Sequence, residues 1–235
     1  SSSTTKRTTS SERKPSEQTQ PLCEQSAATR LKQYQGALRK LAQSKALHSG
    51  DISRVFCALS EACCNMLHVK RASLWLLTEK RAAIKLIDAC TSGRHHSTPP
   101  FVFRLSDWPA HLRSLTRTQR TIAVHDVSRN PCFKELAPWY LSSFRINAML
   151  SAPIRQNGKL VGALCAESIG TPRRWTRHEE DLISLLATMT SLALEAAERR
   201  EVEQALRVAK DAAEVANRAK SELRASMRHE IRTPM

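Results

Sequence analysis

The start of the chain lacks the hydrophobic positions that a folded core requires. Residues 1–20 contain Ser, Thr, Gln, Pro15 and charged residues, but no aliphatic or aromatic side chain. Such a segment cannot bury enough apolar surface to offset the entropy lost on folding, so we expect a disordered tail over residues 1–30. From Leu31 onward, apolar residues recur at helical spacing and predict a lead-in helix within residues 31–48.

A second amphipathic pattern begins at Asp51, a residue type that favours the N-cap of a helix. The apolar residues after it trace one helical face, which we expect to pack on a sheet. They are Ile52, Val55, Phe56, Leu59, Ala62, Cys63, Met66 and Leu67.

Short alternating or continuous apolar runs follow and predict the strands of that sheet. The expected strands are 72–77, 83–89, 101–105, 121–125, 146–154 and 160–167. Residues 91–100 are expected to form a loop. The dipeptide Asn157-Gly158 is the strongest signal for a two-residue hairpin, so the last two strands should pair. Pro153 indicates an edge position or a bulge.

The C-terminal part of the chain predicts one long helix that begins at a capping box formed by Thr176 and Glu179. The core positions expected in its first part are Leu182, Leu185, Leu186, Met189 and Leu192. Beyond Ala197, an apolar seam with heptad spacing continues. Its positions are Val202, Leu206, Ala209, Ala213, Ala216, Lys220, Leu223 and Met227. Because the seam holds more Ala than Leu, residues 198–219 should form a weak coiled coil that changes register easily.

This order of elements resembles the GAF domain, and several segments carry the resemblance. They are residues 73–77, 126–133, 152–155, 157–162 and 172–179. The resemblance implies an α+β fold over residues 49–197, with a GAF-like antiparallel sheet flanked by helices and continuing into the long C-terminal helix. It also implies a sensory module with a small-molecule pocket, or a dimerisation platform. The ligand stays unknown, because a fold does not assign a function.

The last segment, residues 220–235, carries the most specific motif. Read as a helix, Leu223, Met227 and Ile231 form an apolar line, and His229 points away from it. A histidine exposed in this way can accept a group from a second protein. The adjacent carboxylate of Glu230 favours the charged imidazole and can steady one ring nitrogen while the other attacks.

This segment resembles the start of the phosphoacceptor helix in the dimerisation domain of sensor histidine kinases. The matching positions are Lys220, Ser221, Glu222, Ala225, Met227, His229, Glu230, Ile231, Arg232, Thr233 and Pro234. The resemblance implies that His229 is the phosphorylated nucleophile, Glu230 its proton-accepting partner and Thr233 a helper in phosphate removal. Leu223, Arg224 and Arg228 depart from the pattern. The two arginines are four positions apart, which costs a few tenths of a kcal/mol on one helix face.

The combined resemblance implies the sensory and phosphoacceptor part of a two-component sensor histidine kinase that works as a homodimer through its C-terminal helix. His229 would take the γ-phosphate of ATP and pass it to an aspartate of a response-regulator receiver domain. The chain ends before the ATP-binding kinase domain, so ATP and Mg²⁺ are implied only for that missing domain, and this chain alone should be inactive. The alternative is a non-enzymatic ligand-binding or dimerisation module with a vestigial phosphoacceptor box.

The net charge of +15 and the pI near 10.0 raise nucleic acid as a partner. The basic residues are scattered without a basic block or interleaved aromatics, so we expect no nucleic-acid binding. No apolar run is long enough to span a bilayer and no signal peptide is visible, which indicates a cytoplasmic protein. The seven cysteines are an odd number without Cys-x-x-Cys spacing and indicate reduced thiols.

Candidate metal and cofactor residues are few. Cys64 and His68 are four positions apart, and His95 and His96 lie in the expected loop. Two ligands without a third at a recognisable spacing do not define a metal site, so none is predicted. No bilin is expected either, because the neighbourhoods of Cys90 and Cys132 do not resemble a chromophore attachment site. His125, at a strand end, is expected to be structural.

Overall fold

The structure is a computed structural model that describes residues 29, 32, 34–45, 51–78, 82–96, 101–104, 110–118, 120–134 and 140–231. The side chains of residues 111, 112 and 225–231 lie outside this description. The chain divides into two units, Ser1–Lys40 and Leu41–Met235. In the first unit, residues 34–40 are helical and fall within the expected lead-in helix. Apart from Thr29, the expected disordered tail lies outside the described residues.

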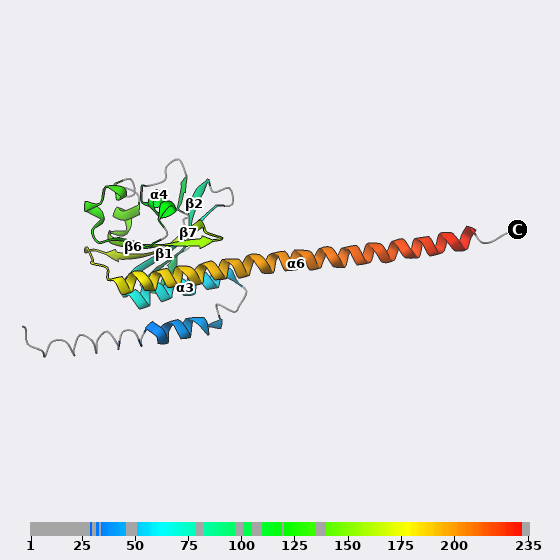
Figure 1. Cartoon of the computed structure of the whole chain (residues 1–235), viewed down its shortest axis with the longest axis horizontal. Coiled ribbons are helices and arrows are strands. Elements are labelled where there is room, and N and C mark those ends of the chain that lie inside the picture. The colour runs from blue at the N-terminus through cyan, green and yellow to red at the C-terminus, as the bar shows by residue number, and fades with distance from the viewer. Residues whose placement is uncertain are drawn as a thin grey trace, which may run out of the picture. The chain divides into compact units, whose positions relative to one another are not determined.

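The second unit contains an antiparallel sheet in which the described residues form seven strands in the order β3-β2-β1-β7-β6-β5, with β4 pairing beside β3 on β2 (Figure 1). The strands are β1 Arg71–Leu77, β2 Ala83–Thr91, β3 Arg94–His96, β4 Val102–Arg104, β5 Ile122–Val124, β6 Ile146–Gln156 and β7 Lys159–Ile169. The α+β fold with an antiparallel sheet and a long C-terminal helix is therefore confirmed.

Two helices cover one face of this sheet. Helix α3 (Ile52–Leu67) and the first part of α6 (Arg177–Ile231) lie side by side there, while α4 (Ala110–Arg117) lies over the opposite face (Figure 1). Asp51 caps α3 as predicted, because its side chain accepts from the backbone N–H of Ser53 at 3.0 Å. We call the two sides the helix face and the loop face.

The loop face also carries the 3-10 helices η2 (Val127–Arg129) and η3 (Pro131–Phe133) and the short helix α5 (Ser142–Phe144). A hydrophobic cluster on this face joins Trp75, Leu86, Leu115, Phe133, Tyr140 and Met149 with further buried residues. Among the described residues, no helix has both the length and the apolar composition needed to cross a bilayer.

The hairpin between β6 and β7 confirms the turn signal. Asn157 and Gly158 have φ values of 50° and 74°, which are the left-handed conformations that a two-residue type I′ turn needs. Pro153 pairs with Ala163 of β7, whereas β5 contacts β6 only over residues 149–151. The described strands therefore leave the side of β6 next to Pro153 free, and a register shift follows at 154/155, as the proline predicts.

The expected loop at 91–100 is wrong for part of its length. Strand β3 occupies Arg94–His96 and pairs with β2, from Ala89↔His96 to Thr91↔Arg94. Ser92 and Gly93 supply the two positive φ values of the turn, 49° and 77°. The strand is polar throughout and shows no apolar alternation, so its sequence contains no periodic signal.

The core positions expected on α6 are also partly wrong. Leu182 and Leu186 are buried, but Leu185 and Leu192 are 44% and 59% exposed. The buried face of the helix instead turns toward Ile183 and Ala187, and toward Thr190, whose hydroxyl donates to the Leu186 carbonyl. The first part of α6 thus has two apolar stripes, and periodicity alone does not say which one meets the sheet.

Candidate functional site

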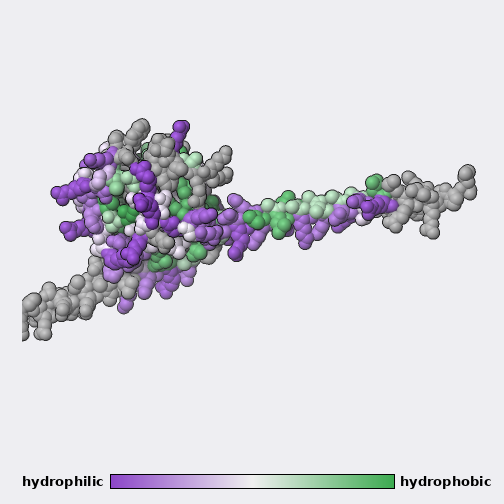
Figure 2. Space-filling view, turned by 45° about the horizontal axis from the view of Figure 1, so that its top comes forward, coloured by the Kyte–Doolittle hydropathy of each residue, from purple (hydrophilic) through white to green (hydrophobic). Residues whose placement is uncertain are grey.

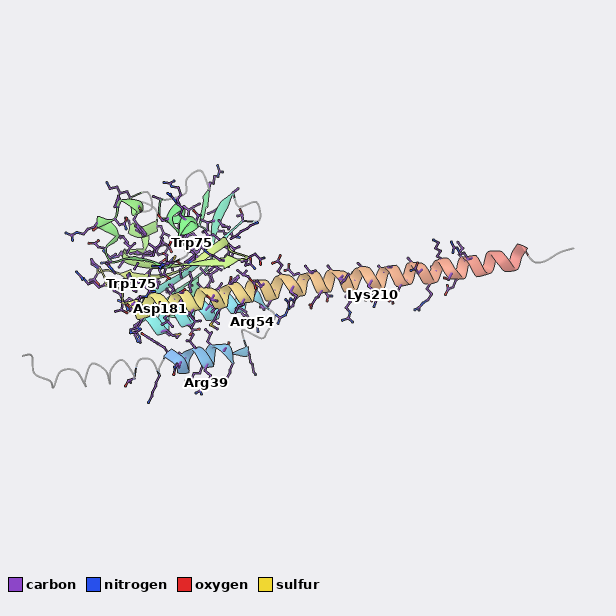
Figure 3. The ribbon with its side chains drawn as sticks, in the orientation of Figure 1. Arg39, Arg54, Trp75, Trp175, Asp181 and Lys210 are labelled. Atoms are coloured by element: carbon purple, nitrogen blue, oxygen red, sulfur yellow. The ribbon has the colours of Figure 1, made fainter. Side chains whose placement is uncertain are left out.

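The predicted phosphoacceptor residues lie at the far end of α6. The helix is continuous from Arg177 to Ile231, so positions 229 and 230 have helical backbone. The side chains of His229 and Glu230, and all of Thr233, lie outside the described residues. Every side chain from 198 to 224 is exposed, and Lys210 projects from this part of the helix (Figure 3). Within the described chain, α6 is therefore the physical connection between the GAF-like unit and the predicted box.

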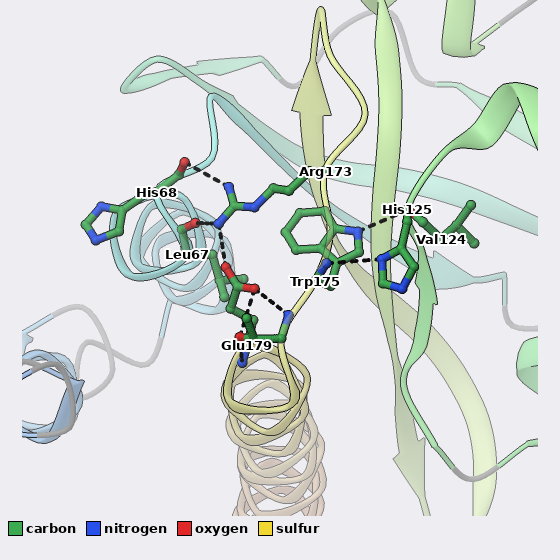
Figure 4. A network of polar contacts seen from close by, with 8 residues as sticks. Leu67, His68, Val124, His125, Arg173, Trp175 and Glu179 are labelled. Atoms are coloured by element: carbon green, nitrogen blue, oxygen red, sulfur yellow. Dashed lines mark hydrogen bonds and ion pairs between the residues drawn. The ribbon is translucent and has the colours of Figure 1, made fainter. Parts of the chain in front are cut away.

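The start of α6 is held by a network centred on Arg173 (Figure 4). The Arg173 guanidinium donates to the backbone carbonyls of Leu67 at 2.7 Å and His68 at 3.2 Å, and it pairs with Glu179. Carbonyls at the end of a helix have no partner within that helix. Arg173 therefore joins the C-terminal end of α3 to the first turn of α6.

Glu179 belongs at the same time to the capping box that the sequence predicts. The backbone N–H of Thr176 donates to its carboxylate at 2.7 Å, and the N–H of Glu179 donates to the Thr176 hydroxyl at 3.4 Å. The capping box is confirmed. Because one carboxylate serves both Thr176 and Arg173, the beginning of α6 cannot move without disturbing its contact with α3.

The strand β5 reaches the same junction through Trp175. The backbone N–H of Trp175 donates to Nδ1 of His125 at 3.1 Å, and the indole N–H of Trp175 donates to the Val124 carbonyl at 3.1 Å (Figure 4). The Arg173 guanidinium also lies 4.6 Å from the centre of the Trp175 ring. His125 thus acts as a structural acceptor, which confirms the prediction, and α3, β5 and α6 meet at one place.

A second polar network is buried on the loop face of the sheet. Arg71 of β1 and Glu167 of β7 are direct partners in the sheet register, and their side chains form an ion pair at 2.5 Å. Ser73 and Tyr140 each donate a hydroxyl to the same carboxylate, at 2.6 and 2.7 Å. The Nε atom of Arg71 is buried without a hydrogen-bond partner among the described residues.

Aromatic rings surround this ion pair. The Arg71 guanidinium lies 4.1 Å from the centre of the Phe144 ring and 5.1 Å from that of Tyr140. Tyr140 makes edge contacts with Trp75, Phe101 and Phe144, with ring centres 5.2–5.8 Å apart. These aromatic faces stabilise the buried guanidinium by cation–π contacts in addition to its ion pair with Glu167.

The environment of this network shifts the pKa values of its members. Burial acts to lower the pKa of Arg71, but the charges and hydrogen bonds of Glu167 and Tyr140 together outweigh it, and the pKa is raised above its ordinary value. Burial, and then the charge of Glu167, hold the pKa of Tyr140 well above its usual range. Arg71 is therefore always charged and Tyr140 always neutral, which keeps the tyrosine hydroxyl available as a donor.

Sequence reasoning predicted the capping box but missed the contacts of Arg173 and the whole Arg71–Glu167 network. Arg71 and Glu167 stand at inward positions of apolar strands, and a charge at such a position is the only signal that could have shown them. Their partnership follows from the β1–β7 register, which sequence pattern does not give.

The six described cysteines are free thiols, as expected. The Cys64 thiol donates to the Cys90 carbonyl at 3.6 Å. His68 ends α3 with a left-handed φ of 51°, and its backbone N–H donates to the Cys64 carbonyl, so Cys64 and His68 together form the C-terminal cap of the helix.

The class of the fold is defined by its sheet order, by the helices α3 and α6 on one face, and by the short helices on the other. A sequence profile described as "GAF domain" matches residues 51–194 of the chain. The match covers more than half of the chain, and the chain belongs to the GAF domain family. The GAF domain of a phosphoenolpyruvate-protein phosphotransferase from Coxiella burnetii has the same fold, with a TM-score of 0.58 at 15% identity over 75% of this chain and 98% of that one.

Two signalling proteins are similar in sequence. The circadian input-output histidine kinase CikA of Thermosynechococcus vestitus is 32% identical over 120 residues, which are 45% of this chain and 16% of that protein. A protein named as a methyl-accepting chemotaxis protein of Synechocystis sp. is 36% identical over 80 residues, 34% of this chain and 8% of that protein. The chain spans only a small part of both relatives, and the likeness supports a GAF sensory domain of signalling proteins.

Proposed function

We propose that this chain is the sensory and phosphoacceptor part of a two-component sensor histidine kinase. The observation that carries the proposal is the continuity of α6, which runs without a break from the capping box at Thr176 to the box around His229. A histidine kinase among its relatives agrees with this role. A helix of 55 residues spans about 82 Å at 1.5 Å per residue, which is long enough to carry a mechanical signal out of the GAF domain.

The reaction at His229 follows from the resemblance of the box. One imidazole nitrogen attacks the γ-phosphorus of ATP, a P–N bond forms, and the bond to the bridging oxygen breaks as ADP leaves. Glu230 accepts a hydrogen bond from the other nitrogen and takes its proton, and Thr233 assists phosphate removal. A separate ATP-binding domain supplies ATP and Mg²⁺, and an aspartate of a response-regulator receiver domain receives the phosphoryl group. This chemistry belongs in the cytoplasm.

The same helix would form a parallel homodimer. Val202, Leu206 and Leu223 are exposed on one side of α6, where apolar side chains gather opposite charged ones (Figure 2). Leu185 and Leu192 occupy the same heptad position as Leu206, because all three are separated by multiples of seven. Their exposure in the single chain is explained if a second α6 covers them.

A signal would then follow a defined route. A ligand on the loop face would act on the aromatic residues around Arg71 and on the strands beneath them. Strand β5 passes the change to Trp175, and the Arg173–Glu179 contact passes it to the first turn of α6. A small rotation or register shift of the paired helices would change how readily His229 meets the ATP-binding domain.

The test of phosphorylation uses this chain mixed with an active histidine-kinase catalytic domain and ATP labelled at the γ-phosphate. The chain should incorporate label that is stable in base and lost in acid, as a phosphoramidate is. His229→Gln should abolish incorporation. His178→Gln is the matched control, because His178 is exposed on the same helix and should leave incorporation unchanged. Label that persists in the His229→Gln variant contradicts the proposal.

A second candidate is a non-enzymatic GAF module in which the box is vestigial. The chemotaxis relative and the two arginines Arg224 and Arg228 in the box favour it. This function predicts that neither the wild-type chain nor any variant accepts label, while the dimer through α6 still forms.

A further inference from the structure

Three side chains with metal-binding chemistry meet on the helix face of the sheet. The thiol of Cys57, the carboxylate of Asp88 and the imidazole of His95 place their ligand atoms within 4.8 Å of one another. The Cys57 sulfur lies 3.6 Å from one oxygen of the Asp88 carboxylate. Nδ1 of His95 lies 3.2 Å from each of the two Asp88 oxygens.

The sheet register brings these residues together. Asp88 is opposite Leu74 of β1 and faces α3, on which Cys57 lies. His95 pairs with Cys90, which is two positions from Asp88 on β2. The side chains of His95 and Asp88 are therefore diagonal neighbours on the same face of the sheet. The three residues come from α3, β2 and β3, and their spacing along the chain resembles no known ligand pattern.

We propose that Cys57, Asp88 and His95 form a three-ligand site for a divalent transition-metal ion of the zinc class. A thiolate, an imidazole and a carboxylate are the donors that Zn²⁺ uses, whereas Mg²⁺ and Ca²⁺ take oxygen ligands. Zinc bonds of about 2.0–2.3 Å put tetrahedral ligand atoms roughly 3.3–3.8 Å apart, close to the Cys57–Asp88 separation of 3.6 Å.

The burial of the three groups suits an ion. The Asp88 side chain is only 5% exposed, and a cation would offset its negative charge in that environment. The His95 side chain is 30% exposed, which gives an ion access from solvent and leaves room for water as the fourth ligand. Because the thiolate is the form that binds a metal, an ion at this site would displace the proton of the Cys57 thiol.

An ion at this site would fasten α3 to the β2–β3 hairpin. The other end of α3 is the Leu67 carbonyl that Arg173 binds at the start of α6. Metal occupancy would therefore act on the helix that contacts α6, and it provides a metal-dependent input to the GAF domain. Binding itself does not depend on the proposed kinase function and can be measured whether or not His229 is phosphorylated.

The experiment titrates the reduced chain, freed of metal with a chelator, with Co²⁺ by absorption and with Zn²⁺ by calorimetry. We expect one ion per chain, tetrahedral Co²⁺ bands in the visible range and a sulfur-to-cobalt charge-transfer band. Cys57→Ser should remove the charge-transfer band. His95→Gln and Asp88→Asn should weaken Zn²⁺ binding at least about 100-fold, because even outer-shell changes cost 10–100-fold.

Two matched variants separate this site from the other cysteines and histidines. His96→Gln changes the neighbour of His95 on β3, and Cys132→Ser removes a half-buried thiol elsewhere. Both should bind Zn²⁺ like the wild type. If Asp88→Asn does not fold, the partly exposed His95→Gln still decides the question. Unchanged binding in His95→Gln, or the absence of a sulfur-to-cobalt band in the wild type, overturns the proposal.

Discussion

At the scale of single residues, the buried ion pair between Arg71 and Glu167 carries a large desolvation cost. The two residues are 1% and 0% exposed, so both charges have lost nearly all contact with water. The desolvation cost of such a pair can equal or exceed its attraction, even with added hydrogen bonds such as those from Ser73 and Tyr140. The pair therefore contributes more to the arrangement of the loop face than to the free energy of unfolding.

Removing one charge should reveal this balance. Glu167→Gln leaves the Arg71 charge buried without an ionic partner, and we expect it to lower the free energy of unfolding by about 3–5 kcal/mol. The double variant Arg71→Met/Glu167→Leu should recover most of that loss, because no buried charge remains. Urea denaturation of both variants measures the difference.

The control for this prediction is Glu214→Gln, which breaks the exposed Lys210–Glu214 contact at 3.9 Å on α6. An exposed pair of this kind contributes at most about 0.5 kcal/mol. If Glu167→Gln costs no more than Glu214→Gln, the buried pair does not have the energetic role described here.

Which residues could be predicted from sequence depends on how far apart their partners are. The caps at Asp51 and Thr176 are local, since their acceptor and donor groups lie within three positions, and sequence predicted both. Arg71 and Glu167 are 96 positions apart, and Cys57 and Asp88 are 31 apart. Such partnerships follow from strand register and helix placement, which no local pattern specifies.

At the scale of elements, the junction at the start of α6 connects the sheet, α3 and the long helix. Arg173 is the residue that touches most of these parts, through two carbonyls of α3, the Glu179 carboxylate and the Trp175 ring. Its side chain is mostly buried, so these contacts are poorly screened by solvent.

Substitution of Arg173 tests the junction. Arg173→Met leaves the Leu67 and His68 carbonyls without this donor, and we expect a loss of about 1–3 kcal/mol in the free energy of unfolding. Arg174→Met is the control, because Arg174 is exposed and adjacent. Thermal and urea unfolding compare the two. An equal effect of both substitutions would show that the junction contributes nothing specific.

The predictability of elements follows the strength of their periodicity. Helix α3 and the β6–β7 hairpin carry a clear apolar period and a defined turn, and both were predicted. Strand β3 was missed because Arg94, His95 and His96 give no alternation. The exposure of Leu185 and Leu192 was missed because an exposed apolar stripe on a helix has the same period as a stripe that packs on the sheet.

At the scale of the whole molecule, the proposed function requires α6 to serve two partners in succession. Its first part packs against the GAF sheet and α3, and its second part carries an exposed apolar stripe that would pair with another copy of α6 in the proposed dimer. An isolated helix of this composition is only marginally stable in water, so most of its stability should come from pairing. The proposed signalling route therefore depends on the proposed dimer.

Amide hydrogen exchange over residues 198–224, followed by mass spectrometry on the full chain, tests this claim most directly. We predict slow exchange in the wild type and fast exchange in Leu206→Glu, which loses about 1.5–3 kcal/mol of apolar burial per chain. Arg207→Glu, on the charged side of the helix, should exchange slowly like the wild type. Exchange in the wild type as fast as in an unfolded reference peptide would contradict the account, because no continuous paired helix would then reach His229.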